Sequence, residues 1–190
     1  MKTSAVEEQE DSVAQWNVLV TAQEGSAREL KRFVKDYGVF RWSKFRNVLL
    51  GWVPDHGVFL RALAEGLEKK PFAHNWLGKV VPIALTVPVH LDTFAEDVQS
   101  HLLVLLDQLT GKSFHVRVER RGHKGQLHTH QLEQHLGDYL WDQLQRRDDR
   151  PAVSFKDPDV VVVVEITGET AGIGIIPRRL REEFPFVKID

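Results

Sequence analysis

The segment VVVVVEIT (160–167) constrains the fold of this chain most, because seven β-branched residues there surround a single glutamate. A continuous β-branched run is typical of a central strand that is covered on both faces. The run is also far shorter than the roughly 20 apolar residues that a membrane-spanning helix needs. Hydrophobic residues make up 42% of the chain and charged residues 27%, which indicates an ordinary globular protein. We therefore expect a folded protein without a membrane-spanning segment.

The first half of the chain shows strand and helix patterns in the order β-α-β-β-α-β. Strand patterns cover 16–24 and 79–90, and 39–53 has the pattern of two strands joined by a turn. Amphipathic helix patterns separate these segments. The order is the ferredoxin-like one, and we assign it to residues 15–90.

The second half has a different order of elements. An amphipathic helix is predicted over 91–111, a strand over 113–122 and a second helix over 129–145, in which leucine recurs every fourth residue. The valine-rich strand and its return through a GETAG turn complete a hairpin. We assign residues 91–190 to a second domain, and we predict an α+β protein of two small α/β domains.

Positive charge gathers at the end of the strand SFHVRVERRGHKGQ (113–126), although the net charge of the chain is -2. Residues 111–124 contain five Lys or Arg and only one acid. Alternation places Arg117 and Arg121 on one strand face, where two guanidinium groups could follow a phosphate backbone. Arg120 shares the parity of the apolar residues, so we expect the strand to end or bulge there. The two glycines of RGHKG would let main-chain N–H groups approach a ligand.

Other basic residues form smaller groups. The segment RWSKFR contributes Arg41, Lys44 and Arg46 and mixes them with aromatic residues that could stack on bases. The simplest interpretation of each such group is a solvated surface without a binding role. We nevertheless predict an RNA-binding surface whose residues are Arg117, Arg120, Arg121, His123 and Lys124, extended by Arg41, Lys44 and Arg46, with Lys156, Arg178 and Arg179 as further candidates.

Catalytic and cofactor sites have weaker sequence support. The chain has no cysteine, which excludes disulfides and thiolate metal sites, and it has no G-x-G-x-x-G or Walker motif. His128 and His130 could bind a metal with His135 or Glu133, but their spacing splays the two rings apart, and solvent-facing histidines explain the pattern more simply. We predict no cofactor, no metal and no catalytic residue.

Three collinear segments of the second half carry a family resemblance: FHVRVERRGHKG (114–125), LHTHQLEQHLGDYLWDQL (127–144) and VSFKDPDVVVVVEITGETAGIGII (153–176). Together they resemble the THUMP domain, an RNA-binding module of tRNA-modifying proteins, over roughly residues 90–180. The first half is similar in its element order to the ferredoxin-like domain that often precedes a THUMP domain. The resemblance implies binding of transfer RNA by both domains together.

The resemblance also suggests a role. Many THUMP proteins carry a catalytic domain, and no such domain follows the THUMP-like segment before Asp190. The arrangement resembles the stand-alone adaptors that present tRNA to a separate cytidine acetyltransferase. We therefore expect a non-catalytic, cytoplasmic RNA-binding protein, preceded by a disordered acidic tail over residues 1–14. Two alternatives stay open, namely a metal- or histidine-dependent enzyme acting on RNA and a regulator that binds an acidic protein.

Overall fold

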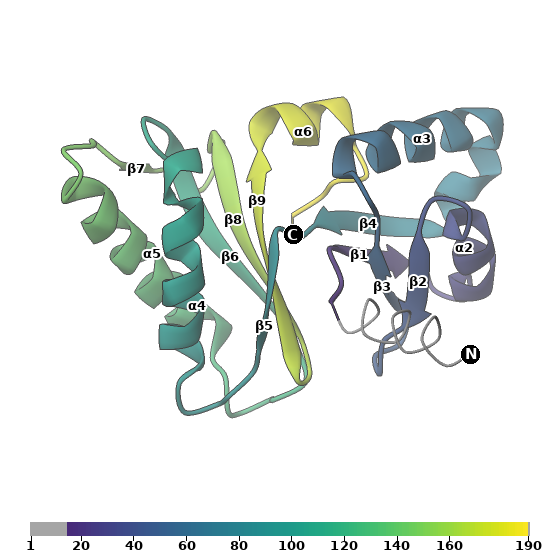
Figure 1. Ribbon diagram of the computed structural model, residues 1–190. Coiled ribbons are helices and arrows are strands. Elements are labelled where there is room, and N and C mark those ends of the chain that lie inside the picture. The colour runs from purple at the N-terminus through teal and green to yellow at the C-terminus, as the bar shows by residue number, and fades with distance from the viewer. Residues whose placement is uncertain (1–14, 190) are drawn as a thin grey trace, which may run out of the picture. The chain divides into compact units, whose positions relative to one another are not determined.

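The computed structural model describes residues 15–189, which form two β-sheets with helices packed on them (Figure 1). The predicted α+β class is confirmed. The chain divides into two compact units, the first made of 15–83 and 184–188 and the second of 84–183 with residue 189. The predicted domain ranges differ from these units at residues 84–90 and 184–188. The predicted tail, 1–14, lies outside the described residues.

The first unit contains one four-stranded antiparallel sheet with the order β2-β3-β1-β4. Its elements are β1 (Val18–Ala22), α2 (Ala27–Val34), β2 (Val39–Trp42), β3 (Val48–Trp52), α3 (His56–Lys69), the 3-10 helix η1 (Pro71–Asn75) and β4 (Leu77–Pro82). Apart from η1, this order agrees with the sequence pattern. Asp55 begins α3 by accepting a hydrogen bond from the Val58 N–H at 2.7 Å, which satisfies one free donor of the first turn.

Strand β3 of the β2–β3 hairpin requires a glycine at position 51. Phe40 of β2 lies opposite Gly51 of β3, and a Cβ atom at Gly51 would stand only 2.4 Å from the Phe40 ring. The ring therefore occupies the space that a side chain would need. This close packing holds the hairpin that carries Arg41, Lys44 and Arg46.

The segment 79–90 is not the single strand that its apolar pattern predicted. β4 ends at Pro82, and a separate strand β5 (Leu85–Pro88) belongs to the other sheet. The Ile83 N–H still donates to Asn17 in the first unit at 2.8 Å, whereas the Ala84 N–H donates to Ile173 in the second unit at 2.8 Å. Apolar alternation indicates extended backbone but not the sheet to which it belongs.

The second unit contains a five-stranded sheet with the order β5-β9-β8-β6-β7. Its other elements are α4 (Phe94–Leu102), the 3-10 helix η2 (Leu103–Gln108), β6 (Ser113–Arg121), α5 (Thr129–Gln145), β7 (Ala152–Val153), β8 (Val160–Thr167), β9 (Thr170–Pro177) and α6 (Arg178–Glu183). β8 is the central strand, and all eight of its residues are buried. The interpretation of VVVVVEIT as a central, fully covered strand is therefore confirmed.

Helices α4 and α5 lie side by side over one face of this sheet (Figure 1). The leucines at every fourth position of α5 are buried against Phe114, Val116 and Val118 of β6. The predicted amphipathic helix over 91–111 is α4 followed by η2. Because β6 turns its even-numbered side chains into this core, its odd-numbered side chains project from the opposite face. Within residues 15–189, no helix combines the length and apolar character needed to cross a bilayer.

Candidate nucleic-acid interface

Strand β6 carries the largest group of predicted RNA-binding residues. It pairs in parallel with β8 in unbroken register from Phe114 opposite Val160 to Arg121 opposite Thr167. The expected end or bulge at Arg120 is therefore wrong. Arg120 keeps its place in the ladder, and its Nη1 donates to the Gly122 carbonyl at 2.7 Å, so this guanidinium is engaged by the turn that follows the strand.

Arg121 is the most enclosed of the predicted residues. Its guanidinium donates to Glu165 of β8 and to Glu119 of β6, the latter at 2.9 Å. Only 18% of the Arg121 side chain and 3% of the Glu165 side chain are exposed. A buried carboxylate needs a paired cation, so this contact explains how glutamate is tolerated in the middle of a valine strand. Because the Arg121 guanidinium is already paired with two carboxylates, it is less available to a ligand than the strand alternation suggested.

Arg117 is more accessible. Its side chain is 43% exposed, and its nearest acidic partner, Glu133 of α5, is 3.5 Å away. Glu133 also accepts a shorter hydrogen bond, 2.9 Å, from the Val118 N–H. That bond satisfies a backbone N–H on the edge of β6 that β7 does not reach, because β7 pairs with β6 only at Ser113 and Phe114. The long contact to Glu133 leaves the Arg117 guanidinium able to bind a phosphate.

The turn after β6 has an unusual backbone. Gly122, His123 and Gly125 all have positive φ, at 94°, 51° and 82°. Glycine adopts this conformation freely, but histidine does so only with support from its surroundings. His123 has such support, because its Nε2 donates to the Gly168 carbonyl at 2.8 Å. The turn thereby presents Lys124 to solvent at its tip.

The loop before β8 brings other predicted residues to the start of β6. Arg178 pairs with Asp157 at 3.0 Å and with Asp159 at 3.1 Å, so it is committed to this loop. Asp159 in turn accepts hydrogen bonds from the Ser113 N–H and hydroxyl at 2.8 and 2.7 Å. These two bonds, with smaller contributions from Arg178 and Lys112, hold the pKa of Asp159 below its ordinary value despite partial desolvation.

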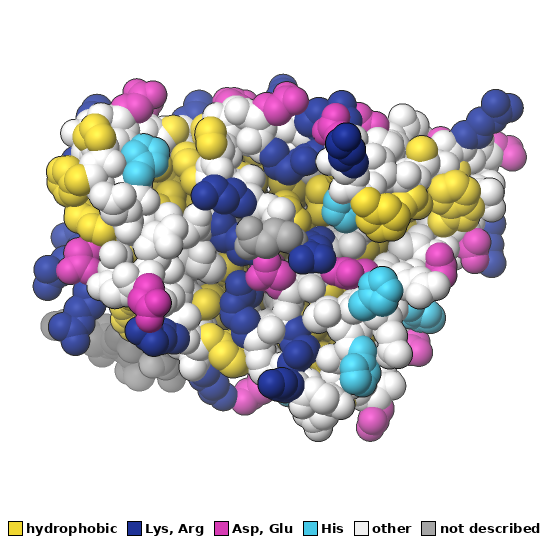
Figure 2. All heavy atoms as spheres, turned by 180° about the vertical axis from the view of Figure 1, so that it is seen from behind, with side chains coloured by type: hydrophobic (Ala, Val, Ile, Leu, Met, Phe, Trp, Pro, Cys, Tyr) yellow, Lys and Arg dark blue, Asp and Glu magenta, His cyan; other side chains and the backbone are white. Residues whose placement is uncertain are grey.

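Two residues near this loop stay exposed. Lys156 and Arg179 project to solvent, and neither has an ion-pair partner within the part of the chain that the structure describes. Of the predicted residues of the second unit, the accessible ones are thus Arg117, Lys124, Lys156 and Arg179. Figure 2 shows one face of the molecule, on which Lys and Arg side chains are interspersed with Asp and Glu rather than massed together.

The remaining predicted cations, Arg41, Lys44 and Arg46, lie on the β2–β3 hairpin of the first unit. Arg41 is half-buried, while Lys44 and Arg46 are exposed. Arg46 pairs with Glu24 at 3.0 Å, but both side chains are at least three-quarters exposed, so the pair is weak. Trp42 is 42% exposed, with the Lys31 ammonium 5.3 Å from its ring centroid, so this aromatic residue is available at the surface.

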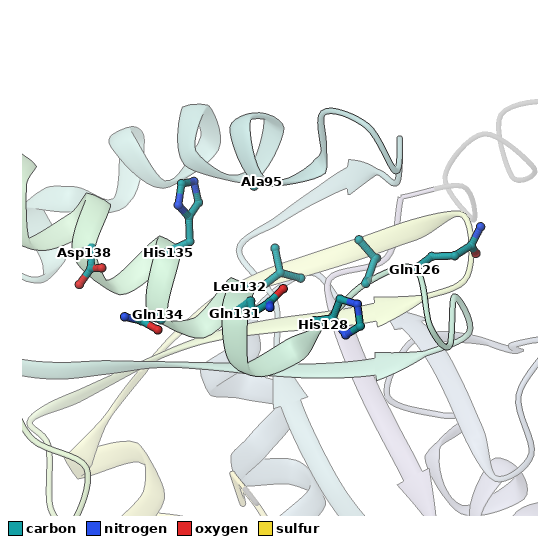
Figure 3. A pocket seen from close by; sticks show the side chains of 9 residues that line it. Ala95, Gln126, His128, Gln131, Leu132, Gln134, His135 and Asp138 are labelled. Atoms are coloured by element: carbon teal, nitrogen blue, oxygen red, sulfur yellow. The ribbon is translucent and has the colours of Figure 1, made fainter.

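His128 and His135 line a polar hollow of about 500 Å³ between α4 and α5 (Figure 3). His135 points toward α4, where its Nε2 accepts from the Gln99 amide at 2.9 Å. Across residues 15–189, no three His, Asp or Glu side chains are grouped to hold a metal ion.

A second hollow, of about 420 Å³, was missed by the sequence analysis. It lies between β6, α5 and the loop around β7, and its wall includes Trp141, Val153 and Phe155. Phe155 is 80% exposed. The only sequence signal is an aromatic residue within a polar, turn-rich segment. The strand β7, which precedes Phe155, contains only Ala152 and Val153.

Comparisons with known proteins agree with this architecture. Residues 96–176 match the family model of the THUMP domain. No curated protein sequence matches the chain. The fold is similar to that of TrmN from Thermus thermophilus, with a TM-score of 0.62 and 18% identity over 90% of this chain and 48% of that one.

Two further structures share the fold. PH1313 from Pyrococcus horikoshii Ot3 has a TM-score of 0.56 and 12% identity, covering 86% of this chain and 55% of that one. A 4-thiouridine synthetase, solved in complex with RNA and ATP, has a TM-score of 0.52 and 14% identity, covering 86% of this chain and 42% of that one. The chain thus spans about half the length of these structures.

Proposed function

We propose that this chain, which contains a THUMP domain in residues 96–176, binds transfer RNA and presents it to a separate tRNA-modifying enzyme. The domain itself supports RNA binding. Two structures of similar fold are TrmN and a 4-thiouridine synthetase bound to RNA, and the latter's complex supports an RNA ligand here. In this proposal the chain holds the RNA in the cytoplasm and performs no chemistry itself.

The observation that carries the proposal is the set of cations that the fold leaves accessible inside the THUMP domain. Arg117, Lys124 and Lys156 come from β6, from the turn after it and from the loop before β8. Arg121 and Arg178 are instead held by carboxylates. A phosphate backbone would therefore meet Arg117, Lys124 or Lys156, and Arg179 is a further exposed candidate.

Single alanine substitutions test this assignment. Arg117→Ala, Lys124→Ala and Lys156→Ala should each weaken tRNA binding about threefold to tenfold, because each removes one phosphate contact. Fluorescence anisotropy with labelled tRNA measures the affinity. Arg147→Ala is the matched control, since it removes an exposed arginine of the same unit that already pairs with Asp107. Equal affinities for the wild type and all three variants would contradict the assignment.

The adaptor role needs a separate experiment. Deletion of the gene should reduce acetylated cytidine in purified tRNA, measured by mass spectrometry of nucleosides, and the wild-type gene should restore it. An Arg117→Ala/Lys156→Ala variant should restore it only partly. Unchanged acetylation after deletion would contradict the adaptor role in cytidine acetylation. It would not contradict the proposal that the chain binds tRNA.

A further inference from the structure

The sheet of the first unit has one open edge. β2 is its outermost strand, and no other strand among residues 15–189 pairs with the outer side of β2 (Figure 1). The opposite edge strand, β4, is instead covered by the segment around Phe186, whose carbonyl accepts from the Val80 N–H at 2.9 Å. Folded proteins commonly protect a free strand edge with a proline or a bulge, and β2 contains neither. The edge of β2 is therefore able to pair with a further strand.

The ladder between β2 and β3 determines which backbone groups of β2 face outward. The Ser43 N–H donates to the Val48 carbonyl at 3.0 Å, and bonded and non-bonded pairs alternate along two antiparallel strands. Arg41 is therefore bonded to β3, whereas Phe40 and Trp42 direct their N–H and C=O groups away from it. These outward groups are the hydrogen-bonding edge that an added strand would use.

Side chains on both faces of β2 leave apolar surface beside this edge. Phe40 is buried against Phe59 of α3, with ring centroids 5.9 Å apart. Trp42 shares the face of Phe40 but is 42% exposed. On the other face, Val39 is 48% exposed and lies opposite Trp52, which is also partly exposed. An added strand would cover part of Trp42 on one face and part of Val39 on the other.

Positive charge lies on both faces of the edge. On the face that the helices cover, the Lys31 ammonium is 5.3 Å from the Trp42 ring centroid. Arg41 projects from the other face, and its Nε is buried without a hydrogen-bond partner among residues 15–189. Lys44 follows in the exposed turn at the end of the strand. Because carboxylates on an added strand could pair with Lys31 and Arg41, the edge favours an acidic segment.

The same charges disfavour a second copy of this chain at the edge. Two β2 strands paired with each other would bring the Arg41 and Lys31 side chains of both copies to one seam. Like charges on neighbouring strands destabilise the pairing. A strand from a different, acidic protein meets no such repulsion.

We propose that the edge of β2 binds an extended, acidic segment of another protein by strand addition. Main-chain hydrogen bonds to Phe40 and Trp42 would hold the segment, and Lys31 and Arg41 would select its carboxylates. The inference goes beyond the proposed function and does not depend on it, because the cations on which that proposal rests lie in the second unit. It gives the first unit a protein-binding surface of its own.

Amide hydrogen exchange of the full chain with three synthetic peptides tests the proposal. The peptides are acetyl-VEVEVE-amide, its lysine counterpart acetyl-VKVKVK-amide, and the acidic peptide N-methylated at every internal residue. The acidic peptide, at about ten times its Kd, should slow exchange of the Phe40 and Trp42 amides about tenfold. The other two peptides at the same concentration should leave both amides unchanged, because one lacks the negative charge and the other lacks the N–H donors.

Variants of the chain separate the contributions of backbone and charge to the Kd of the acidic peptide. Trp42→Pro removes the ring and the outward N–H, whereas Trp42→Ala removes only the ring, so Trp42→Pro should bind about two- to tenfold more weakly than Trp42→Ala. Lys31→Glu should weaken binding about threefold to tenfold, because it replaces an attraction with a repulsion. Phe72→Ala removes an exposed phenylalanine of the same unit and should change nothing. Circular dichroism checks that each variant is folded.

Four results would overturn the proposal. They are an absence of protection by the acidic peptide, equal protection by the lysine peptide, undiminished protection by the N-methylated peptide, and protection of both amides by tRNA in place of the acidic peptide. A dimer in analytical ultracentrifugation that Trp42→Pro converts to a monomer would assign the edge to a second copy and would also overturn it. None of these results bears on tRNA binding through Arg117, Lys124 and Lys156, which their own alanine variants test.

Discussion

Arg121 shows how one contact changes the interpretation of a residue. Alternation places it beside Arg117, yet its guanidinium joins two glutamates, one of which is almost fully buried. The two arginines therefore differ in role even though they share a strand face. Removing both together would mix a loss of ligand contact with a loss of fold stability.

Arg121→Ala should lower the free energy of unfolding by about 3 kcal/mol, because Glu165 would lose a paired cation while staying buried. Urea denaturation at pH 7 measures the change. Arg117→Ala is the matched control and should cost less than about 1 kcal/mol, since its ion pair is long and partly exposed. Similar losses for the two variants would show that Arg121 is not structural.

Among the strands of the second unit, β6 and β8 are connected at their starts by Asp159, which accepts two hydrogen bonds from Ser113. Its pKa is lowered from an ordinary value of 3.8, so folding is favoured by its charged form. The contribution of Asp159 to stability is fully present above about pH 4, which is its pKa in the unfolded chain. It is lost as the pH falls through the lower pKa that Asp159 has in the folded protein.

Asp159→Asn should destabilise the protein at pH 7 and flatten the loss of stability on acidification below pH 4. Urea midpoints measured between pH 2.5 and 7 test this expectation. Asp92→Asn, at an exposed aspartate, should leave the pH profile unchanged. If the urea midpoints of Asp159→Asn and of the wild type depend on pH in the same way, Asp159 does not contribute to the loss of stability in acid.

For the molecule as a whole, a net charge of -2 means that RNA binding depends on a few local cations and not on a general positive field. The logarithm of tRNA affinity should fall with the logarithm of salt concentration at a slope of about -3 to -4. Each of Arg117→Ala, Lys124→Ala and Lys156→Ala should make the slope shallower by about 1. A salt-independent affinity would contradict a phosphate-binding surface.

The elements themselves could be predicted because their signals are local. The leucines of α5, the alternation of β6 and the valine run of β8 each reflect the period of one element, and all three segments formed as expected. Residues 79–90 were predicted as one strand, although they belong to β4 and β5 of different sheets. This error arose because extended backbone has the same apolar pattern whichever sheet it joins. Residues 184–188 were misassigned for a related reason: Phe186 accepts a hydrogen bond from Val80, a partner far away in the sequence.

Periodicity, motif order and composition are enough to predict the α+β class, the THUMP resemblance and the position of the basic cluster. The accessibility of each cation, by contrast, depends on contacts that form only in the folded protein. Arg121 and Arg178 meet carboxylates of Glu165 and Asp157 that are more than 20 residues away in the chain. Likewise, Phe155 stacks on His115 only because the fold brings these two residues together. Ion pairing and stacking depend on distances in space, which a one-dimensional pattern does not contain.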